Sequence, residues 1–177
     1  MKMRTKYELT NETMLYNGVT LHRIKATEDF SNVIEGDLGG WVEHEGNLSR
    51  YGDCWIYDNA KVLNNASVIS NSTIKDNAVV DNNARVEGNS IVQDNAVVTD
   101  TALVSGNCWI YNNAVISGNA EIRGGVSVGG DCCITESSEV YGNASVEGYV
   151  TVKGIAKVFG DTKLAGKFAI SCGYISE

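Results

Sequence analysis

The stretch Asp53-Cys54-Trp55-Ile56-Tyr57-Asp58 is the first of twenty consecutive six-residue repeats, and Lys167-Phe168-Ala169-Ile170-Ser171-Cys172 is the last. No insertion or deletion interrupts the series. The fourth position of every repeat is aliphatic, and all of these residues except Leu164 are β-branched, which favours extended backbone. The second position is small in nearly every repeat and is alanine ten times. Because positions two apart point to the same side of a strand, both positions face one interior.

The sixth and first positions of the repeats carry turn residues. Glycine occupies the sixth position ten times and asparagine the first position eleven times. Both residues accept a positive φ at low cost. A single repeat cannot bury its apolar side chains alone, so the repeats must wind into a coil and stack on their neighbours. Three repeats per coil give about 6.7 coils over residues 53–172, with asparagine ladders along the corners. The predicted fold class is therefore all-β, a single-stranded parallel β-helix.

This repeat register resembles the hexapeptide-repeat class of left-handed parallel β-helix proteins, and the left hand is implied by that resemblance. The resemblance covers residues 53–172. More narrowly, the Gly-Asn-Ala-x-Val register and the leader at residues 36–43, Gly-Asp-Leu-Gly-Gly-Trp-Val-Glu, resemble the YdcK-like proteins of enterobacteria and their phages and prophages. The narrower resemblance implies a phage or prophage origin and supplies little chemistry.

The two ends of the chain depart from the repeat. Residues 13–24 predict a β-hairpin with Asn17 and Gly18 as a type I′ turn. We expect residues 1–52 to form a cap on the N-terminal edge of the β-helix, because open strand edges aggregate. Residues 173–177 are expected to form a C-terminal tail. Alternatively, the cap also carries a ligand site, around His22, Arg23, Asp37 and Trp41.

The third and fifth positions of the repeats face outward. Val79, Val97 and Val115 recur every 18 residues and therefore stack on one face, one coil apart. A ladder of outward apolar side chains predicts a self-association face, and we expect a homotrimer because β-helices of this class are commonly trimers. The alternative is that valine merely favours strand backbone on a solvated face.

A second face carries aromatic side chains, because the tetrapeptide Cys-Trp-Ile-Tyr occurs at residues 54–57 and again at 108–111. The copies are separated by 54 residues, which is three coils, so both lie on one face. Exposed aromatic side chains are enriched in binding sites. The candidate ligand- or partner-binding residues are Trp55, Tyr57, Trp109, Tyr111, Arg85 and Arg123, the two arginines as partners for phosphate. Alternatively, the tetrapeptides reflect repeat duplication, with the aromatic rings packed into a subunit contact.

Charge and cysteine usage limit the partners. The formal net charge of −8 opposes nonspecific binding to nucleic acid or to an anionic membrane. No apolar stretch approaches the roughly 18 residues of a membrane span. Cys54, Cys108 and Cys132 occupy the buried second position, which predicts reduced thiols and a cytoplasmic location, in the host bacterium if the gene is phage-encoded.

The histidines argue against the chemistry common in this class. Hexapeptide-repeat acyltransferases typically use a histidine as general base near a subunit boundary, yet His22 and His44 both lie in the cap region. Two histidines also cannot supply the three ligands of a zinc carbonic anhydrase. The sequence therefore predicts a non-enzymatic protein, without cofactor or metal, that binds a host protein or acts as a scaffold through its outer faces and subunit clefts. The alternatives are a phage protein that sequesters a nucleotide-like host signal, and an acyltransferase with His44 as general base.

Overall fold

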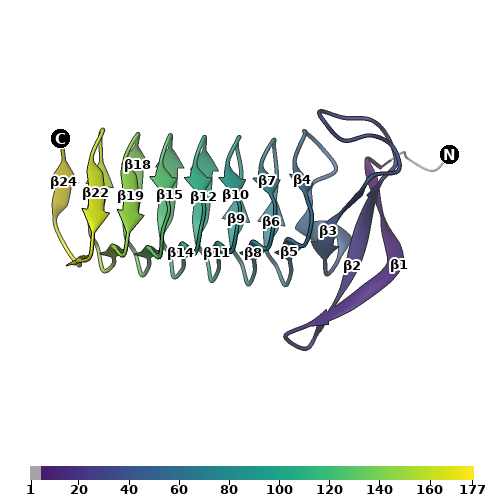
Figure 1. The fold of residues 1–177 in the computed structure, drawn as a ribbon, viewed down its shortest axis with the longest axis horizontal. Coiled ribbons are helices and arrows are strands. Elements are labelled where there is room, and N and C mark those ends of the chain that lie inside the picture. Colours follow the sequence, from purple (N-terminus) through teal and green to yellow (C-terminus); the bar gives the residue numbers. More distant parts are fainter. Residues whose placement is uncertain (1–4) are drawn as a thin grey trace.

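The computed structural model describes residues 5–177 and confirms the parallel β-helix expected from the repeats; it is consistent with the left hand that the family resemblance implies. The chain winds about a horizontal axis in Figure 1, from the N-terminal cap at the right to the C-terminus at the left. The described residues contain one short 3₁₀ helix, η1 (Glu45–Asn47), and no α-helix. No helix within residues 5–177 has the length and apolarity that a membrane crossing requires.

Three sheets form the faces of the β-helix, and each face is named here after its first strand along the repeats. The β5 face contains β1 (Tyr7–Tyr16), β2 (Val19–Ala26), β3 (Leu38–Val42), β5 (Lys61–Val62), β8 (Val79–Val80), β11 (Val97–Val98), β14 (Val115–Ile116), β17 (Cys133–Ile134), β20 (Thr151–Val152) and β23 (Ala169–Ile170). The β4 face contains β4 (Trp55–Ile56), β7 (Thr73–Ile74), β10 (Ile91–Val92), β13 (Trp109–Ile110), β16 (Ser127–Val128), β19 (Ser145–Gly148) and β22 (Lys163–Gly166). The β6 face contains β6 (Ser67–Val68), β9 (Arg85–Val86), β12 (Leu103–Gly106), β15 (Glu121–Gly124), β18 (Glu139–Gly142), β21 (Lys157–Phe159) and β24 (Tyr174–Ser176).

The interior is the column that the repeat predicts. Every fourth-position side chain from Ile56 to Val158 is fully buried, and the small second-position residues are buried beside them. Strands one coil apart pair in parallel and in register, as Val97 does with Val79 on one side and Val115 on the other. Small second-position residues let the three faces approach, and the aliphatic column then fills the axis.

The corners explain the turn residues. The predicted asparagine ladders are present, for example where Asn71 donates to Asn89 at 3.1 Å and Asn89 donates to Asn107 at 2.9 Å. At this same corner, which enters the β4 face, the residue before each ladder position is glycine in every coil except at Ser70, which also has a positive φ. Gly106 has a φ of +98°, and a Cβ there would lie 2.6 Å from the carbonyl oxygen of Gly124 in the next coil. Glycine allows this close stacking without a side-chain clash.

The β-helix has about 8 turns rather than 6.7, because a first coil lies within the segment expected to be the cap. Val42 pairs with Val62, and Leu48 forms a parallel bridge with Val68. Val42 and Leu48 are six residues apart, but Leu48 and Ile56 are eight apart, so two extra residues displace this coil from the hexad register.

The cap itself is built on a long hairpin. β1 and β2 are antiparallel, and Asn17 (φ 50°) and Gly18 (φ 82°) form the predicted turn. The far half of the hairpin extends beyond β3 and reaches below β3 and β5 in Figure 1. Leu21 on β2 forms a buried cluster with Trp41, Leu63 and Val79, so the hairpin covers the beginning of the β5 face.

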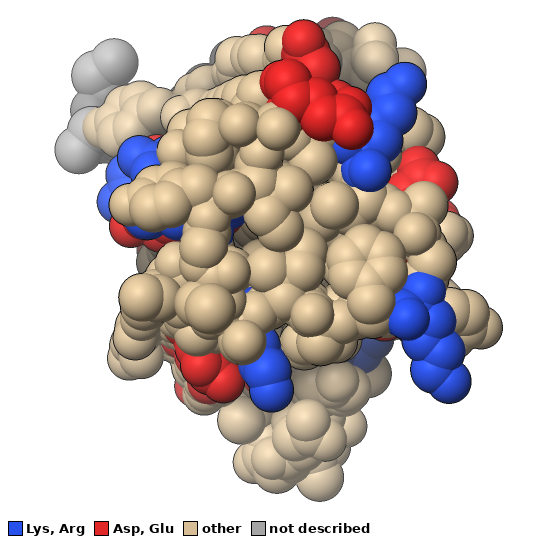
Figure 2. All heavy atoms as spheres, turned by 90° about the vertical axis from the view of Figure 1, so that its left-hand side faces the viewer, with Lys and Arg blue, Asp and Glu red and all other residues tan. Residues whose placement is uncertain are grey.

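At the other end, residues 173–177 continue the coil instead of forming a separate tail. β24 pairs with β21, and Lys157 lies opposite Tyr174, a step of 17 residues instead of 18. The last interior residues, Leu164, Ile170 and Ile175, are only partly buried. Seen from this end, the centre of the surface carries neither basic nor acidic side chains, which gather at its rim (Figure 2).

Candidate functional site

His44 lies at the corner that follows β3, in the first coil, and its side chain is exposed. Its Nε2 is 3.0 Å from the carbonyl oxygen of Asn64, and the backbone N–H of Gly46 donates to its Nδ1 at 3.1 Å. A carbonyl oxygen only accepts hydrogen bonds, so the partners assign the proton of the neutral ring to Nε2. Nδ1 therefore holds the basic lone pair.

The loop that carries His44 is fixed by a buried amide. Asn47 donates from Nδ2 to the carbonyl oxygens of Asn64 and Ala66, each at 2.9 Å. Its Oδ1 accepts from the backbone N–H groups of Glu43 at 3.1 Å and His44 at 2.9 Å. The Asn64 carbonyl thus holds both the loop and the imidazole ring, which sets the orientation of the ring before any substrate arrives.

Polar groups around this corner are largely engaged in holding it together. Glu43 accepts from the backbone N–H of Asn64 at 2.6 Å, and Glu45 forms an ion pair with Arg50. The hydroxyl of Tyr7 donates to the carbonyl oxygens of Glu45 and Leu48, each at 2.8 Å. Burial, with Glu45 adding to it, raises the pKa of Tyr7 above its usual range, so the phenol stays neutral. Tyr7 acts here as a structural anchor.

The cap residues suggested as a second ligand site are distributed over separate contacts. His22 is half-buried on β2, opposite Val42. The guanidinium of Arg23 stacks over the Trp41 ring at 5.1 Å, and the Asp37 carboxylate accepts from the backbone N–H of Ile34 at 2.9 Å.

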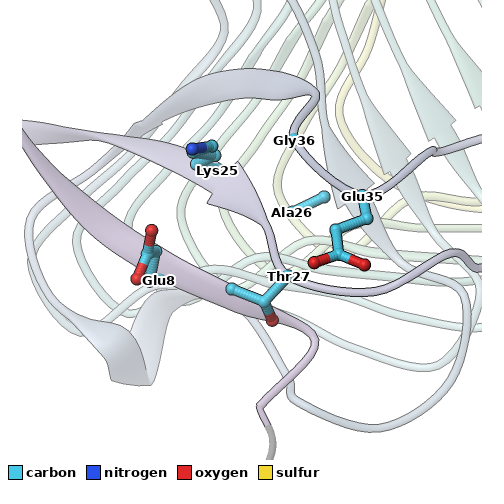
Figure 3. Close-up of a pocket in the computed structure, with 6 residues that line it drawn as sticks. All are labelled: Glu8, Lys25, Ala26, Thr27, Glu35 and Gly36. Atoms are coloured by element: carbon cyan, nitrogen blue, oxygen red, sulfur yellow. The ribbon is translucent and has the colours of Figure 1, made fainter.

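The cap contains a polar pocket of about 420 Å³ that sequence reasoning did not locate. Glu8 on β1 and Lys25 on β2 lie on one side of it, and Glu35 reaches in from the loop before β3 (Figure 3). The complete lining is Glu8, Lys25, Ala26, Thr27, Glu35 and Gly36. These are common surface residues with no distinctive spacing, so the sequence held no signal for it.

The two copies of the aromatic tetrapeptide have different surroundings, which corrects the expectation of one shared exposed surface. Trp55 is 1% exposed, because Tyr7 and Phe30 from the cap pack edge-on against it at ring distances of 6.3 and 5.4 Å. Tyr57 beside it is half-buried. Trp109, by contrast, is 47% exposed. The cap therefore withdraws the first copy from solvent.

Trp109 and Tyr111 form a rigid aromatic pair on the β4 face. Their rings stack at 4.6 Å with an interplanar angle of 29°, and the Tyr111 hydroxyl donates to Glu147 at 2.8 Å. The Tyr111 ring crosses Gly129 of the next coil, where a Cβ would lie 2.2 Å from it. Burial, reinforced by the hydrogen bond to Glu147, raises the pKa of Tyr111.

The arginine candidates lie elsewhere and already have anionic partners. Arg85 and Arg123 are on the β6 face, away from Trp109. Arg85 pairs with Glu87 at 2.8 Å, and Arg123 pairs with Glu139 at 2.7 Å. The candidate rings Trp109 and Tyr111 therefore lie on a different face from the candidate arginines Arg85 and Arg123.

The valine stripe is partly covered by the chain itself. Val79 is buried under the hairpin, and Val97 and Val115 are half-buried.

Among residues 5–177, no group of three or more histidine, cysteine, aspartate or glutamate side chains could hold a metal ion.

Comparison with known proteins gives one informative similarity. No protein-family model matches the chain. Over 76 residues the chain is 37% identical to a protein of Escherichia coli strain K12 described as the uncharacterized acetyltransferase YdcK. The match covers 38% of this chain and 23% of the relative, so the chain spans less than a quarter of that protein's length. The YdcK resemblance expected from the repeat is confirmed.

This similarity overturns the prediction of a non-enzymatic protein. That prediction depended on the absence of histidine from residues 53–172. It placed His22 and His44 together in the cap region, whereas His44 belongs to the first coil and binds the backbone of the next. A histidine outside the repeat register can therefore still lie on the β-helix.

Proposed function

We propose that this protein is an acyltransferase that transfers an acyl group from a thioester such as acetyl-coenzyme A to a hydroxyl or amine, with His44 as general base. The observation that carries the proposal is the fixed ring of His44, whose Nδ1 lone pair lies at an exposed corner of the first coil. The fold supports it, because hexapeptide-repeat acyltransferases typically use such a histidine. The similarity to a protein described as an acetyltransferase supports it further.

The chemistry follows from the ring geometry. The acceptor's oxygen or nitrogen attacks the thioester carbonyl carbon while Nδ1 of His44 takes the acceptor's proton. The C–S bond then breaks, and the leaving thiolate recovers that proton from the imidazolium. The Asn64 carbonyl, which accepts from Nε2–H, stabilises the imidazolium formed between the two steps. The Gly46 N–H that now meets Nδ1 comes from only two residues away, and an incoming acceptor replaces it.

The test is release of free coenzyme A thiol from acetyl-coenzyme A, with a panel of sugar, amino-sugar and amine acceptors. His44→Ala is expected to lower turnover by about 100-fold or more, the usual contribution of a general base. His22→Ala is the matched control, since it removes the only other histidine, and it should retain activity. Turnover that survives His44→Ala, or absence of thiol release with every acceptor, would refute the proposal.

A further inference from the structure

The aromatic pair on the β4 face is built as a fixed platform, and the acyltransferase proposal does not use it. Tyr111 lies across Gly129 and reaches Glu147, so the ring spans from β13 to β19. Trp109 stacks against it and leaves nearly half of its surface to solvent. The hydrogen bond and the stacking hold both rings in place, so a ligand would not have to order them.

The charge next to the platform is negative, and the nearest lysine beyond Glu147, Lys163 on β22, lies one coil further along. On the outward positions of β10, β13, β16 and β19, Glu147 is the one charged side chain. The adjoining corner adds two carboxylates next to the residues that follow Tyr111. Asp94 accepts from the backbone N–H of Asn112 at 2.8 Å, and Asp131 accepts from the side chain of Asn113 at 2.8 Å. The nearest cation in the Tyr111 row, Lys75, lies two coils away.

We propose that Trp109, Tyr111 and Glu147 form a binding site for a small alkylammonium ligand. A cation over the face of an indole ring is attracted by the ring's quadrupole, and Trp is the strongest partner for it. The N-methyl or methylene groups of such a ligand pack on the rings, while Glu147, Asp94 and Asp131 supply the opposite charge. A nucleotide or other anion would meet these three carboxylates, and β10, β13, β16 and β19 carry no outward cation to offset them.

The experiment titrates the protein with choline and follows tryptophan fluorescence. Trp109 is the reporter, because Trp41 and Trp55 are 8% and 1% exposed. The neutral isostere 3,3-dimethylbutan-1-ol has the same shape without the charge, so its affinity should be about five-fold lower than that of choline. A rising salt concentration should lower the affinity for choline and leave the affinity for the isostere unchanged.

Three variants localise the site. Trp109→Leu keeps an apolar side chain but removes the π face, and choline affinity, followed by ligand-observed nuclear magnetic resonance, should fall about five-fold. Glu147→Gln should weaken choline, whereas Glu136→Gln, the same charge change at an exposed residue on another corner, should not. Equal binding of choline and its isostere would overturn the proposal, as would undiminished binding to Trp109→Leu. Binding of an oligolysine peptide without choline binding would indicate a polypeptide surface and would also overturn it.

Discussion

Replacing Trp55 with alanine tests how the cap is joined to the β-helix. The side chain is 1% exposed and is enclosed by Tyr7 and Phe30 on the cap and by Gly39, whose Cβ would meet the indole at 2.6 Å. Truncation removes a whole buried indole at the junction, and the cap cannot close over the space without moving a strand. A Trp→Ala change in a core costs about 3–5 kcal/mol.

The chain provides its own matched control. Trp109 occupies the same position in the same tetrapeptide, three coils further along, but it is 47% exposed and packs chiefly on Tyr111. Trp109→Ala should therefore cost about 1 kcal/mol or less. For a domain of this size, about 2–4 °C of melting temperature corresponds to each kcal/mol, so the two variants should differ by roughly 5–15 °C.

Far-UV circular dichroism is the suitable assay, because it does not depend on the fluorophore that each variant removes. Urea unfolding of both variants and of the unmodified protein gives the two changes in the free energy of unfolding on one scale. If Trp55→Ala and Trp109→Ala lose the same stability, the cap does not pack on the first coil as described. In that case the cap would not cover the first coil, and it would not hold the loop that carries His44 in place.

Two further predictions concern the cap anchor and the outer valines. Tyr7→Phe should cost about 1–3 kcal/mol near pH 8, because the buried carbonyl of Leu48 and the part-buried carbonyl of Glu45 lose their shared donor. Burial raises the pKa of Tyr7, so its contribution to stability is complete below the pKa of about 10 in the unfolded chain and declines above it. The difference in the free energy of unfolding between the unmodified protein and Tyr7→Phe, measured by urea unfolding, should therefore be about 1.4 kcal/mol smaller at about pH 11 than near pH 8. A larger difference at pH 11 would contradict this. We also propose that the protein forms a homotrimer through Val97 and Val115; Val115→Asp should shift the native mass to that of a monomer, and an unchanged mass excludes this face. Val79→Asp is not a clean test, because the hairpin buries Val79.

The repeat predicted the β-helix because its signal is redundant. Each buried fourth-position residue, such as Val98, meets the same kind of neighbour above and below, so local preference and packing agree in every coil. The turn at Asn17 and Gly18 was also predictable, because few residue types other than asparagine, aspartate and glycine accept a positive φ at two successive positions. The features that could be predicted are those that depend on residues at a fixed spacing in the sequence.

His44 could be named from the sequence as a candidate base, but the contacts around it could not be predicted, because they depend on breaks in that spacing. His44 contacts Asn64, a separation of 20 residues, only because two extra residues precede Ile56. One signal was available: the small residue Gly40 precedes Val42 by two, as in nearly every repeat, and Leu48 follows Val42 by six. Had these positions been read as a displaced repeat, His44 would have fallen at a corner of the β-helix. The non-enzymatic prediction would then have lost its premise.

The contrast between Trp55 and Trp109 shows the same limit from the other direction. Residues 54–57 and 108–111 are identical, so no property of the tetrapeptide can distinguish a buried tryptophan from an exposed one. The difference arises from Phe30 and Tyr7, which reach the first copy across 25 and 48 residues. A repeat determines which way a side chain points, but the segments outside the repeat determine what it meets. In a β-helix of this kind we therefore expect functional sites where such segments contact the coils, as at His44, or where the outer face of the coils stays exposed, as at Trp109.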